Sequence, residues 1–235
     1  MSLQTLRRSP ASGGTPQQLV VFVHGYGANG ADLMGMADML AHALPDAEFV
    51  APDAPDRVPG APMGFQWFPI SALDIQEMTR GARMAAPVFN AFLDAELARL
   101  GLADSGLALV GFSQGTMLSL QAGLRRKTAP AIIVGFSGAL PDVAALPDEL
   151  ACKPPVFLAH GEADTVVPWQ ATEIAAQTLA KLGLGVAVHM TPGLAHGIAP
   201  EALQIAGLLM RDAYAGDLKL PAGMHTVSAA ASGSA

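Results

Sequence analysis

The chain is poor in cysteine and in charge, and it has no long hydrophobic run. Its 235 residues include a single cysteine, Cys152, so an internal disulfide is excluded and no oxidising compartment is required. Charged residues make up 14% of the sequence and hydrophobic residues 51%, which excludes a largely disordered chain and favours a well-filled core. No apolar stretch approaches the ~20 residues that span a bilayer, so we expect no integral membrane association.

The charge that is present is mainly acidic, with a formal net charge of −7. An acidic surface is a poor match for nucleic acid or an anionic membrane, so we expect neither as a partner. Near the N-terminus, Arg7 and Arg8 are followed by no apolar stretch, which is unlike a secretory signal and predicts a cytoplasmic protein. The sequence leaves open whether the chain forms a homodimer.

The two ends of the chain differ in composition from its middle. Residues 1–17 are rich in Ser, Gly, Pro and Gln and are predicted to be a flexible lead-in. Residues 219–235, with their end rich in Ala, Ser and Gly, are predicted to be a disordered tail. Residues 18–218 form the predicted single domain, a length that α/β folds often reach as one unit.

Between these ends, short apolar runs alternate with helical patterns. Runs of this length bounded by Gly or Pro are typical of strands buried on both faces, and they are Leu19–Val23, Glu48–Ala51, Leu107–Gly111, Ala131–Phe136, Val156–Ala159 and Val186–Met190. The helical patterns cover residues 31–44, 71–100, 114–127, 168–183 and 199–215, with a kink or break expected at Pro87. This alternation predicts an α/β fold, in which a mostly parallel central sheet has helices on both faces. Ligands of such sheets bind at the carboxyl ends of the strands.

A Gly-x-Ser-x-Gly motif, Gly111–Gly115, follows one apolar run and precedes a helical pattern. In this context the motif is typical of a nucleophile elbow, a turn so sharp that side chains two residues before and after the serine would collide. An ordinary Gly-Ser loop is the alternative, since the bare motif also occurs by chance. The strand before it and the helix after it favour Ser113 as a nucleophile at a helix N-terminus, where the helix dipole stabilises negative charge.

A serine nucleophile needs a base and a carboxylate to orient that base, which follow the serine in the order acid, then histidine. Glu162 and Asp164 compete for the role of acid in the turn after the 156–159 run; Asp164 is preferred because it lies deeper, with a helix cap or Asx turn as its alternative role. His196, in a loop with nearby glycines after the last run, is the predicted base. His24 and His160 each precede a glycine at a strand end and are interpreted as packed, hydrogen-bonded histidines.

Two loops are candidates for binding. Residues 24–30 contain three glycines in a short stretch that can approach a ligand closely, and the backbone N–H groups of Tyr26 and Gln114 are the predicted oxyanion hole. A phosphate loop of the Walker type is excluded because no Gly-Lys-Ser/Thr ending follows. Residues 52–70 form a Pro-rich loop whose aromatics either bind an acyl chain or only anchor the loop. The predicted substrate-binding residues are Met63, Phe65, Trp67 and Val167. Neither a metal site nor a cofactor is expected, because no metal-ligand spacing is present.

Together these motifs resemble the phospholipase/carboxylesterase family, which includes the acyl-protein thioesterases. The matching pieces lie in family order over about residues 19–215 and are Val21–Gly30, Gln66–Phe68, Gly111–Gly115, His160–Asp164 with Val167-Pro168, and Ala195–Gly197. The resemblance implies a single-domain α/β-hydrolase without a large cap domain. It also implies a Ser113–Asp164–His196 triad that hydrolyses short- to medium-chain carboxylic esters, lysophospholipids or protein-linked thioesters through an acyl-enzyme.

Three positions depart from the eukaryotic thioesterases of that family. Thr116 stands where they usually have glycine, Tyr26 where they usually have leucine, and Phe68-Pro69 where Phe-Asp is common. These changes leave the chemistry intact and favour a bacterial-type carboxylesterase acting on a small-molecule ester or thioester. An acyl-protein thioesterase or lysophospholipase remains an alternative, as does a non-catalytic binding protein built on a hydrolase fold.

Overall fold

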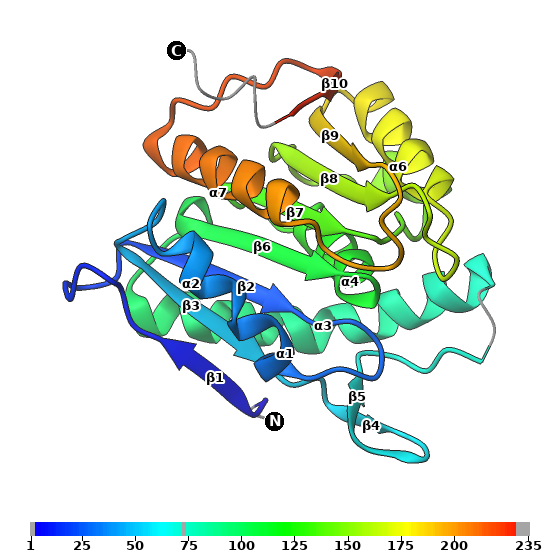
Figure 1. Ribbon diagram of the computed structural model, residues 1–235, viewed down its shortest axis with the longest axis horizontal. Helices are drawn as coiled ribbons and strands as arrows, with labels where there is room; N and C mark the ends of the chain where they lie inside the picture. The colour runs from blue at the N-terminus through cyan, green and yellow to red at the C-terminus, as the bar shows by residue number, and fades with distance from the viewer. Residues whose placement is uncertain (1–2, 72–73, 229–235) are drawn as a thin grey trace.

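The computed structural model describes residues 3–71 and 74–228, and its centre is an eight-stranded sheet (Figure 1). The strands stand in the order β1 (Thr5–Arg8), β3 (Ala47–Pro52), β2 (Gln18–Val23), β6 (Leu107–Phe112), β7 (Ile132–Phe136), β8 (Val156–Gly161), β9 (Gly185–Thr191) and β10 (Gly223–Thr226). Only β1 pairs antiparallel with its neighbour; the other pairings are parallel. The predicted α/β fold with a mostly parallel sheet is confirmed.

All six strands predicted from apolar runs are present, with ends that differ by one or two residues. A separate two-stranded hairpin, β4 (Asp56–Val58) and β5 (Ala61–Gln66), forms within the segment predicted to be a loop, residues 52–70. The prediction of an irregular loop is therefore wrong for these residues. In these two strands, proline and glycine obscure the alternation of apolar and polar residues that would predict a strand.

Both outer strands lie in segments that were expected to be irregular. β1 interrupts the predicted lead-in, where Leu6 pairs with Ala51 of β3 while Arg7 forms an ion pair with Glu96. β10 lies in the predicted tail, where Met224 pairs with Val186 of β9. The predictions of irregular ends are wrong here because edge strands, half exposed, need no apolar run. The remainder of the predicted tail, residues 229–235, lies outside the described residues, and the limits 18–218 remain a prediction.

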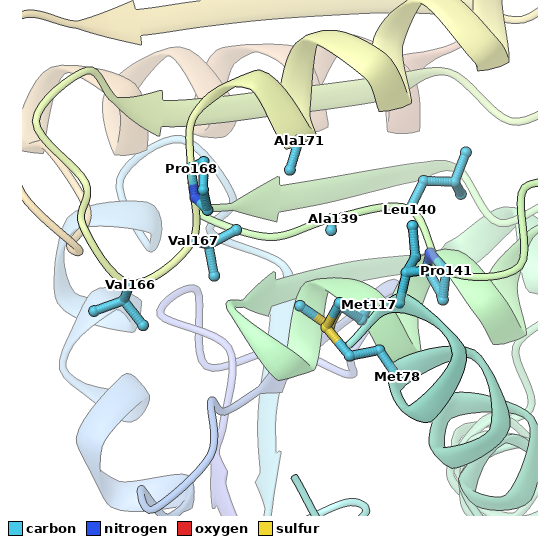
Figure 2. Close-up of a pocket in the computed structure, with 10 residues that line it drawn as sticks. Met78, Met117, Ala139, Leu140, Pro141, Val166, Val167, Pro168 and Ala171 are labelled. Carbon is cyan, nitrogen blue, oxygen red and sulfur yellow. The ribbon is translucent and has the colours of Figure 1, made fainter. Parts of the chain in front are cut away.

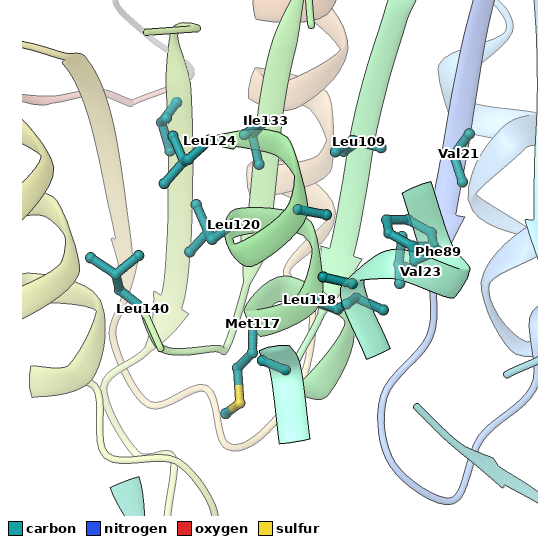
Figure 3. Close-up of a cluster of buried hydrophobic side chains, with 14 of the residues drawn as sticks. Val21, Val23, Phe89, Leu109, Met117, Leu118, Leu120, Leu124, Ile133 and Leu140 are labelled. Atoms are coloured by element: carbon teal, nitrogen blue, oxygen red, sulfur yellow. The ribbon is translucent and has the colours of Figure 1, made fainter. Parts of the chain in front are cut away.

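The helices divide between the two faces of the sheet (Figure 1). One face is covered by α3 (Ile75–Leu100), α4 (Gln114–Gly123) and α6 (Gln170–Lys181), and the other by α1 (Gly30–Met34), α2 (Met36–Leu40) and α7 (Pro200–Ala215). Alternate strand residues feed the two cores: Leu109 packs on the α4 side, whereas Val110 packs on the α7 side. Figure 3 shows the first of these cores, with Leu109, Leu118 and Ile133 between sheet and helix.

Two helical predictions need correction. The pattern predicted as one helix over residues 31–44 is two short helices, which meet at Gly35. Of the kink or break expected at Pro87, the break is absent, since α3 runs from Ile75 to Leu100 with that proline inside it. A further short helix, α5 (Leu146–Glu149), was not predicted. Over residues 3–71 and 74–228, no helix combines the length and the apolar character needed to cross a bilayer.

Substitution of Phe157 tests how much the packing of the central strands contributes to the stability of the fold. Its side chain is fully buried in β8 and packs edge-to-face on Phe136, with ring centroids 6.3 Å apart. We expect Phe157→Ala to lower the free energy of unfolding by about 3–5 kcal/mol, measured by urea denaturation. Ile174→Ala, at a position 57% exposed on α6, should change it by less than about 0.5 kcal/mol. Equal effects of the two substitutions would contradict this view of the core.

Candidate active site

Ser113 occupies a strained turn between β6 and α4. Its backbone has φ 54° and ψ −114°, a conformation that non-glycine residues rarely adopt. A Cβ on Gly115 would lie 1.8 Å from the carbonyl oxygen of Val23, and a Cβ on Gly111 would lie 2.5 Å from the backbone of Gly115. Both glycines of the motif are therefore required by close backbone contacts, as the elbow interpretation predicts.

Thr116 ties this turn to the neighbouring strand. Its hydroxyl oxygen lies 2.8 Å from the carbonyl oxygen of Gly111 and 2.9 Å from that of Phe136, and the N–H of Ser113 donates to the same Phe136 oxygen at 2.9 Å. A Cβ on Gly138 would lie 2.4 Å from the Thr116 Cβ. The threonine that departs from the thioesterase pattern is thus accommodated by a glycine beyond β7, and it adds a polar link beneath Ser113.

Asp164 is buried in the turn after β8 and accepts hydrogen bonds on both oxygens. Oδ1 accepts the N–H groups of Val166 at 2.8 Å and Val167 at 2.9 Å, while Oδ2 lies 2.7 Å from Nδ1 of His196. Burial raises the pKa of Asp164, but the hydrogen bonds from His196 and these two N–H groups outweigh burial and hold its pKa below the usual value. The structure therefore brings Asp164 to His196, whereas Glu162 is exposed to solvent.

His196 is held so that one ring nitrogen stays available. Because Nδ1 faces the carboxylate of Asp164, it carries the proton, and Nε2 keeps a lone pair in the neutral ring. The ring contacts Phe112, the residue before Ser113, with centroids 4.9 Å apart. Among the hydrogen bonds of the described residues, none joins Ser113 to His196. Such bonds are often long without substrate and tighten when it binds.

The glycine loop after β2 lies directly against the turn at Ser113. A Cβ on Gly25 would be 3.3 Å from the Ser113 Cβ, which places the Tyr26 backbone beside the serine. Gln114 is the first residue of α4, so its N–H has no acceptor within the helix. His24 is packed as predicted: it is fully buried, its Nδ1 lies 2.8 Å from the Gly25 carbonyl oxygen, and burial lowers its pKa.

The side chain of Gln114 fixes the segment around Trp67. Its Oε1 accepts the N–H of Trp67 at 2.9 Å and its Nε2 donates to the carbonyl oxygen of Phe68 at 2.8 Å. The indole N–H donates to the His24 carbonyl oxygen at 2.9 Å, and the ring packs against His24 and Phe89. With 3% of its surface exposed, Trp67 anchors the loop, which was the alternative to a binding role. It also lines a second cavity together with Phe68, so its role in substrate binding remains a prediction.

The other two predicted binding residues of this segment lie on the hairpin. Met63 is 77% exposed, and Phe65 is half-buried beneath the guanidinium of Arg57, which lies 4.6 Å from the ring centroid. The backbone of Phe65 exchanges hydrogen bonds with Gly27 and Ala28, so β5 supports the glycine loop. Their role in binding remains a prediction, since neither lines the cavity described next.

An apolar cavity of about 130 Å³ opens beside the elbow (Figure 2). Val167, predicted as a pocket residue, is part of its wall. The full lining is Ile75, Met78, Met117, Ala139, Leu140, Pro141, Val166, Val167, Pro168 and Ala171. Sequence reasoning missed most of these, although Met117 could have been found from its position one helical turn after Ser113.

Within the part of the chain that the structure describes, no three His, Cys, Asp or Glu side chains are grouped to hold a metal ion. The single cysteine, Cys152, is partly buried and its Sγ lies 3.2 Å from the Gly123 carbonyl oxygen; burial raises the pKa of this thiol. At the site, Asp164 contacts the two histidines His160 and His196 through hydrogen bonds.

Comparisons with known proteins find relatives that match most of this chain. The chain is 29% identical to acyl-protein thioesterase 1 of Gibberella zeae over 210 residues, which cover 82% of this chain and 88% of that protein. It is 28% identical to esterase YpfH of Escherichia coli, with 81% and 80% covered. The crystal structure of esterase PE8 superposes with a TM-score of 0.87 at 38% identity, covering 90% of this chain and 99% of that one.

The match to a known protein family covers nearly the whole fold. The phospholipase/carboxylesterase family matches residues 10–210, which include the elbow, the acid turn and the histidine loop. The chain therefore belongs to the phospholipase/carboxylesterase family of α/β-hydrolases and is a carboxylic ester hydrolase.

Proposed function

We propose that Ser113, His196 and Asp164 form the catalytic triad and that hydrolysis proceeds through an acyl-enzyme on Ser113. The observation that carries the proposal is the 2.7 Å contact between Asp164 Oδ2 and His196 Nδ1, beside a serine in a strained elbow. An ionised, buried carboxylate fixes the tautomer of the imidazole and stabilises the imidazolium that forms when it accepts a proton. Strain at a serine is typical of a functional turn.

In the first half of the reaction, Ser113 Oγ attacks the carbonyl carbon of the ester. The hydroxyl proton passes to Nε2 of His196, and the carbonyl π electrons move onto oxygen. When the tetrahedral intermediate collapses, the bond to the leaving group breaks, and the imidazolium donates its proton to the departing alcohol or thiol. In the second half, water loses a proton to His196, attacks the acyl-enzyme and releases the acid, with Ser113 reprotonated.

The negative oxygen of the intermediate needs fixed hydrogen-bond donors. The N–H groups of Tyr26 and Gln114 meet this need, because the glycine loop and the start of α4 both lie against Ser113. The dipole of α4 adds partial positive charge at the same end. Donors of this kind contribute on the order of 10²–10³ each to turnover.

The apolar cavity is the proposed site for the acyl chain. Its wall includes Met117, one helical turn after the nucleophile, and Val167, three residues after the acid. A straight alkyl chain suits such a lining, because each buried methylene gains about 0.8 kcal/mol. This supports esters of short- to medium-chain acids; small-molecule thioesters, lysophospholipids and acylated proteins are alternatives. A cytoplasmic location and a homodimer remain predictions from sequence.

A non-catalytic binding protein on this fold is the competing class. It would retain the cavity but would not need a strained serine beside a carboxylate-bound histidine. A fluorophosphonate probe separates the two classes, since an activated serine becomes covalently labelled and a binding protein does not. Loss of the label in Ser113→Ala would locate it.

Removing the nucleophile gives the direct test of the mechanism. Ser113→Ala should lower kcat on a p-nitrophenyl ester by roughly 10⁴–10⁶, because the remaining groups cannot form an acyl-enzyme. The circular dichroism spectrum should match the parent, since the alanine leaves the backbone contacts of the elbow in place. Activity within tenfold of the parent would show that another residue is the nucleophile.

The pH dependence should reflect a single proton. Asp164 stays ionised well into the acid range because its pKa is lowered, and His160 stays neutral because burial lowers its pKa. Only the neutral form of His196 can accept the serine proton, so kcat/KM should rise with pH and then level off. In a plot of log(kcat/KM) against pH, the acid limb should have a slope of about one. A slope near two would mean that a second group must also lose a proton.

Filling the cavity should change the preference for acyl chains. Ala139 lies in its wall (Figure 2), so Ala139→Leu would occupy the space of two to three methylenes. We expect kcat/KM for an octanoyl ester to fall about tenfold or more relative to an acetyl ester, since roughly 0.8 kcal/mol is lost for each displaced methylene. The matched control Ala144→Leu, at an exposed position outside this cavity, should leave the ratio unchanged. An unchanged ratio in Ala139→Leu would place the acyl chain elsewhere.

A further inference from the structure

His160 is a buried histidine that the mechanism above does not use. It lies near the end of β8, and its side chain has no solvent exposure. Nδ1 lies 2.7 Å from the hydroxyl oxygen of Thr172, and Nε2 lies 3.1 Å from Asp164 Oδ2 and 2.9 Å from the Val167 carbonyl oxygen. The same carboxylate oxygen that meets His196 therefore also meets a second histidine.

The partners of His160 decide which nitrogen carries its proton. Asp164 Oδ2 and the Val167 carbonyl oxygen are both acceptors, so a lone pair on Nε2 would face two oxygens; Nε2 must donate. Burial lowers the pKa of His160, and the neighbouring carbonyl and carboxylate offset only part of this effect. The ring is therefore neutral at neutral pH, and its Nδ1 accepts a hydrogen bond from the hydroxyl group of Thr172.

With this tautomer, each oxygen of Asp164 accepts two hydrogen bonds. The N–H groups of Val166 and Val167 hold Oδ1, and the two imidazoles hold Oδ2 from different segments of the chain. A carboxylate can accept about four such bonds, so none of its acceptor sites is left for water. The carboxyl plane is fixed as a result, and its negative charge is shared between two imidazole N–H groups.

We propose that His160 is a positioning residue, which holds Asp164 Oδ2 toward His196 and limits the basicity of this carboxylate. The inference rests on the triad proposed above. If the His160 donor is removed, more of the negative charge on Oδ2 acts on His196. The imidazolium form of His196 then becomes more stable, and the general base is available only at higher pH.

Few other charged groups act on this cluster. On the turn after β8, Asp164 faces His160, and Glu162 is exposed to solvent. From the loop before α7, His196 faces Asp164. From α6, the group that faces His160 is the uncharged hydroxyl of Thr172, which also lies 3.5 Å from the Gly138 carbonyl oxygen beyond β7. A shift in the pH profile on changing His160 can therefore be attributed to the pair formed by Asp164 and His196.

The test compares two substitutions of His160 with one of another buried histidine. His160→Met removes both ring nitrogens at similar bulk, whereas His160→Gln keeps an amide N–H that can donate from nearly the same place. His189, on the adjacent strand β9, is 6% exposed and contacts the Val227 carbonyl oxygen, so His189→Met is the matched control. For each folded variant, kcat and KM are measured against pH on one p-nitrophenyl ester.

We expect His160→Met to lower kcat about ten- to a hundredfold with KM nearly unchanged, since partners that orient a reacting group typically have effects of this size. The midpoint of its acid limb should move up by roughly half a pH unit. His160→Gln should recover most of kcat and the parent midpoint, and His189→Met should match the parent in both. A fall in kcat with no upward movement of the midpoint would overturn the proposal, because a residue that only fills the core would act in this way.

A measurement on the unmodified protein does not depend on whether a variant folds. In ¹⁵N-histidine-labelled protein, His160, assigned by the signal missing in His160→Gln, should appear as the neutral Nε2–H tautomer across the pH range in which kcat/KM rises. A signal from the other tautomer, or one that titrates in this range, would overturn the proposal. Fluorophosphonate labelling of Ser113 in the same sample tests the triad separately: labelling with a titrating His160 rejects only the inference about His160.

Discussion

The close approach of the Gly115 backbone to the end of β2 is the constraint on which the site depends. The space for a Cβ at Gly115 is taken by the Val23 carbonyl oxygen, so α4 can begin this close to β2 only with glycine at that position. The same contact brings the glycine loop after β2 against Ser113, because that loop starts at the next residue. One steric requirement thus positions the nucleophile, the start of the helix and one proposed oxyanion donor together, before any hydrogen bond is considered.

The parallel sheet supplies the second condition. Ser113, Asp164 and His196 follow β6, β8 and β9, whose carboxyl ends lie along one edge of the sheet (Figure 1). Segments distant in sequence meet there because each strand is joined to the next through a helix packed on a face. The two apolar cores hold these strands in register, and the polar groups at the edge can then be arranged with little freedom to move. The 2.7 Å contact between Asp164 Oδ2, after β8, and His196 Nδ1, after β9, is consistent with this arrangement.

The sequence was most informative where burial is complete. Central strands such as β6 and β8 are largely apolar, so their positions and the side chains after them could be predicted. Edge strands β1 and β10 could not, because pairing on one side and ion pairs such as Arg7–Glu96 stabilise them without an apolar pattern. The sequence left open whether Trp67 binds a ligand or anchors its loop, because an aromatic residue in a loop is compatible with both. The anchoring hydrogen bonds to Gln114 and His24 join segments distant in sequence and are visible only in the folded structure.

The turn after β8 connects the chemistry of the site with its selectivity. Val167 donates its N–H to Asp164 and accepts a hydrogen bond from His160 on its carbonyl oxygen, while its side chain lines the acyl cavity. The residue that bounds the substrate space thus also holds the acid in place. A bulkier side chain at Val167 would press on the segment that supports Asp164. Ala139 is another residue of the wall, and among the hydrogen bonds of the described residues none joins it to the triad. Changes in chain-length preference should therefore arise with least loss of turnover on the Ala139 side of the cavity, and changes at Val167 should affect kcat and selectivity together.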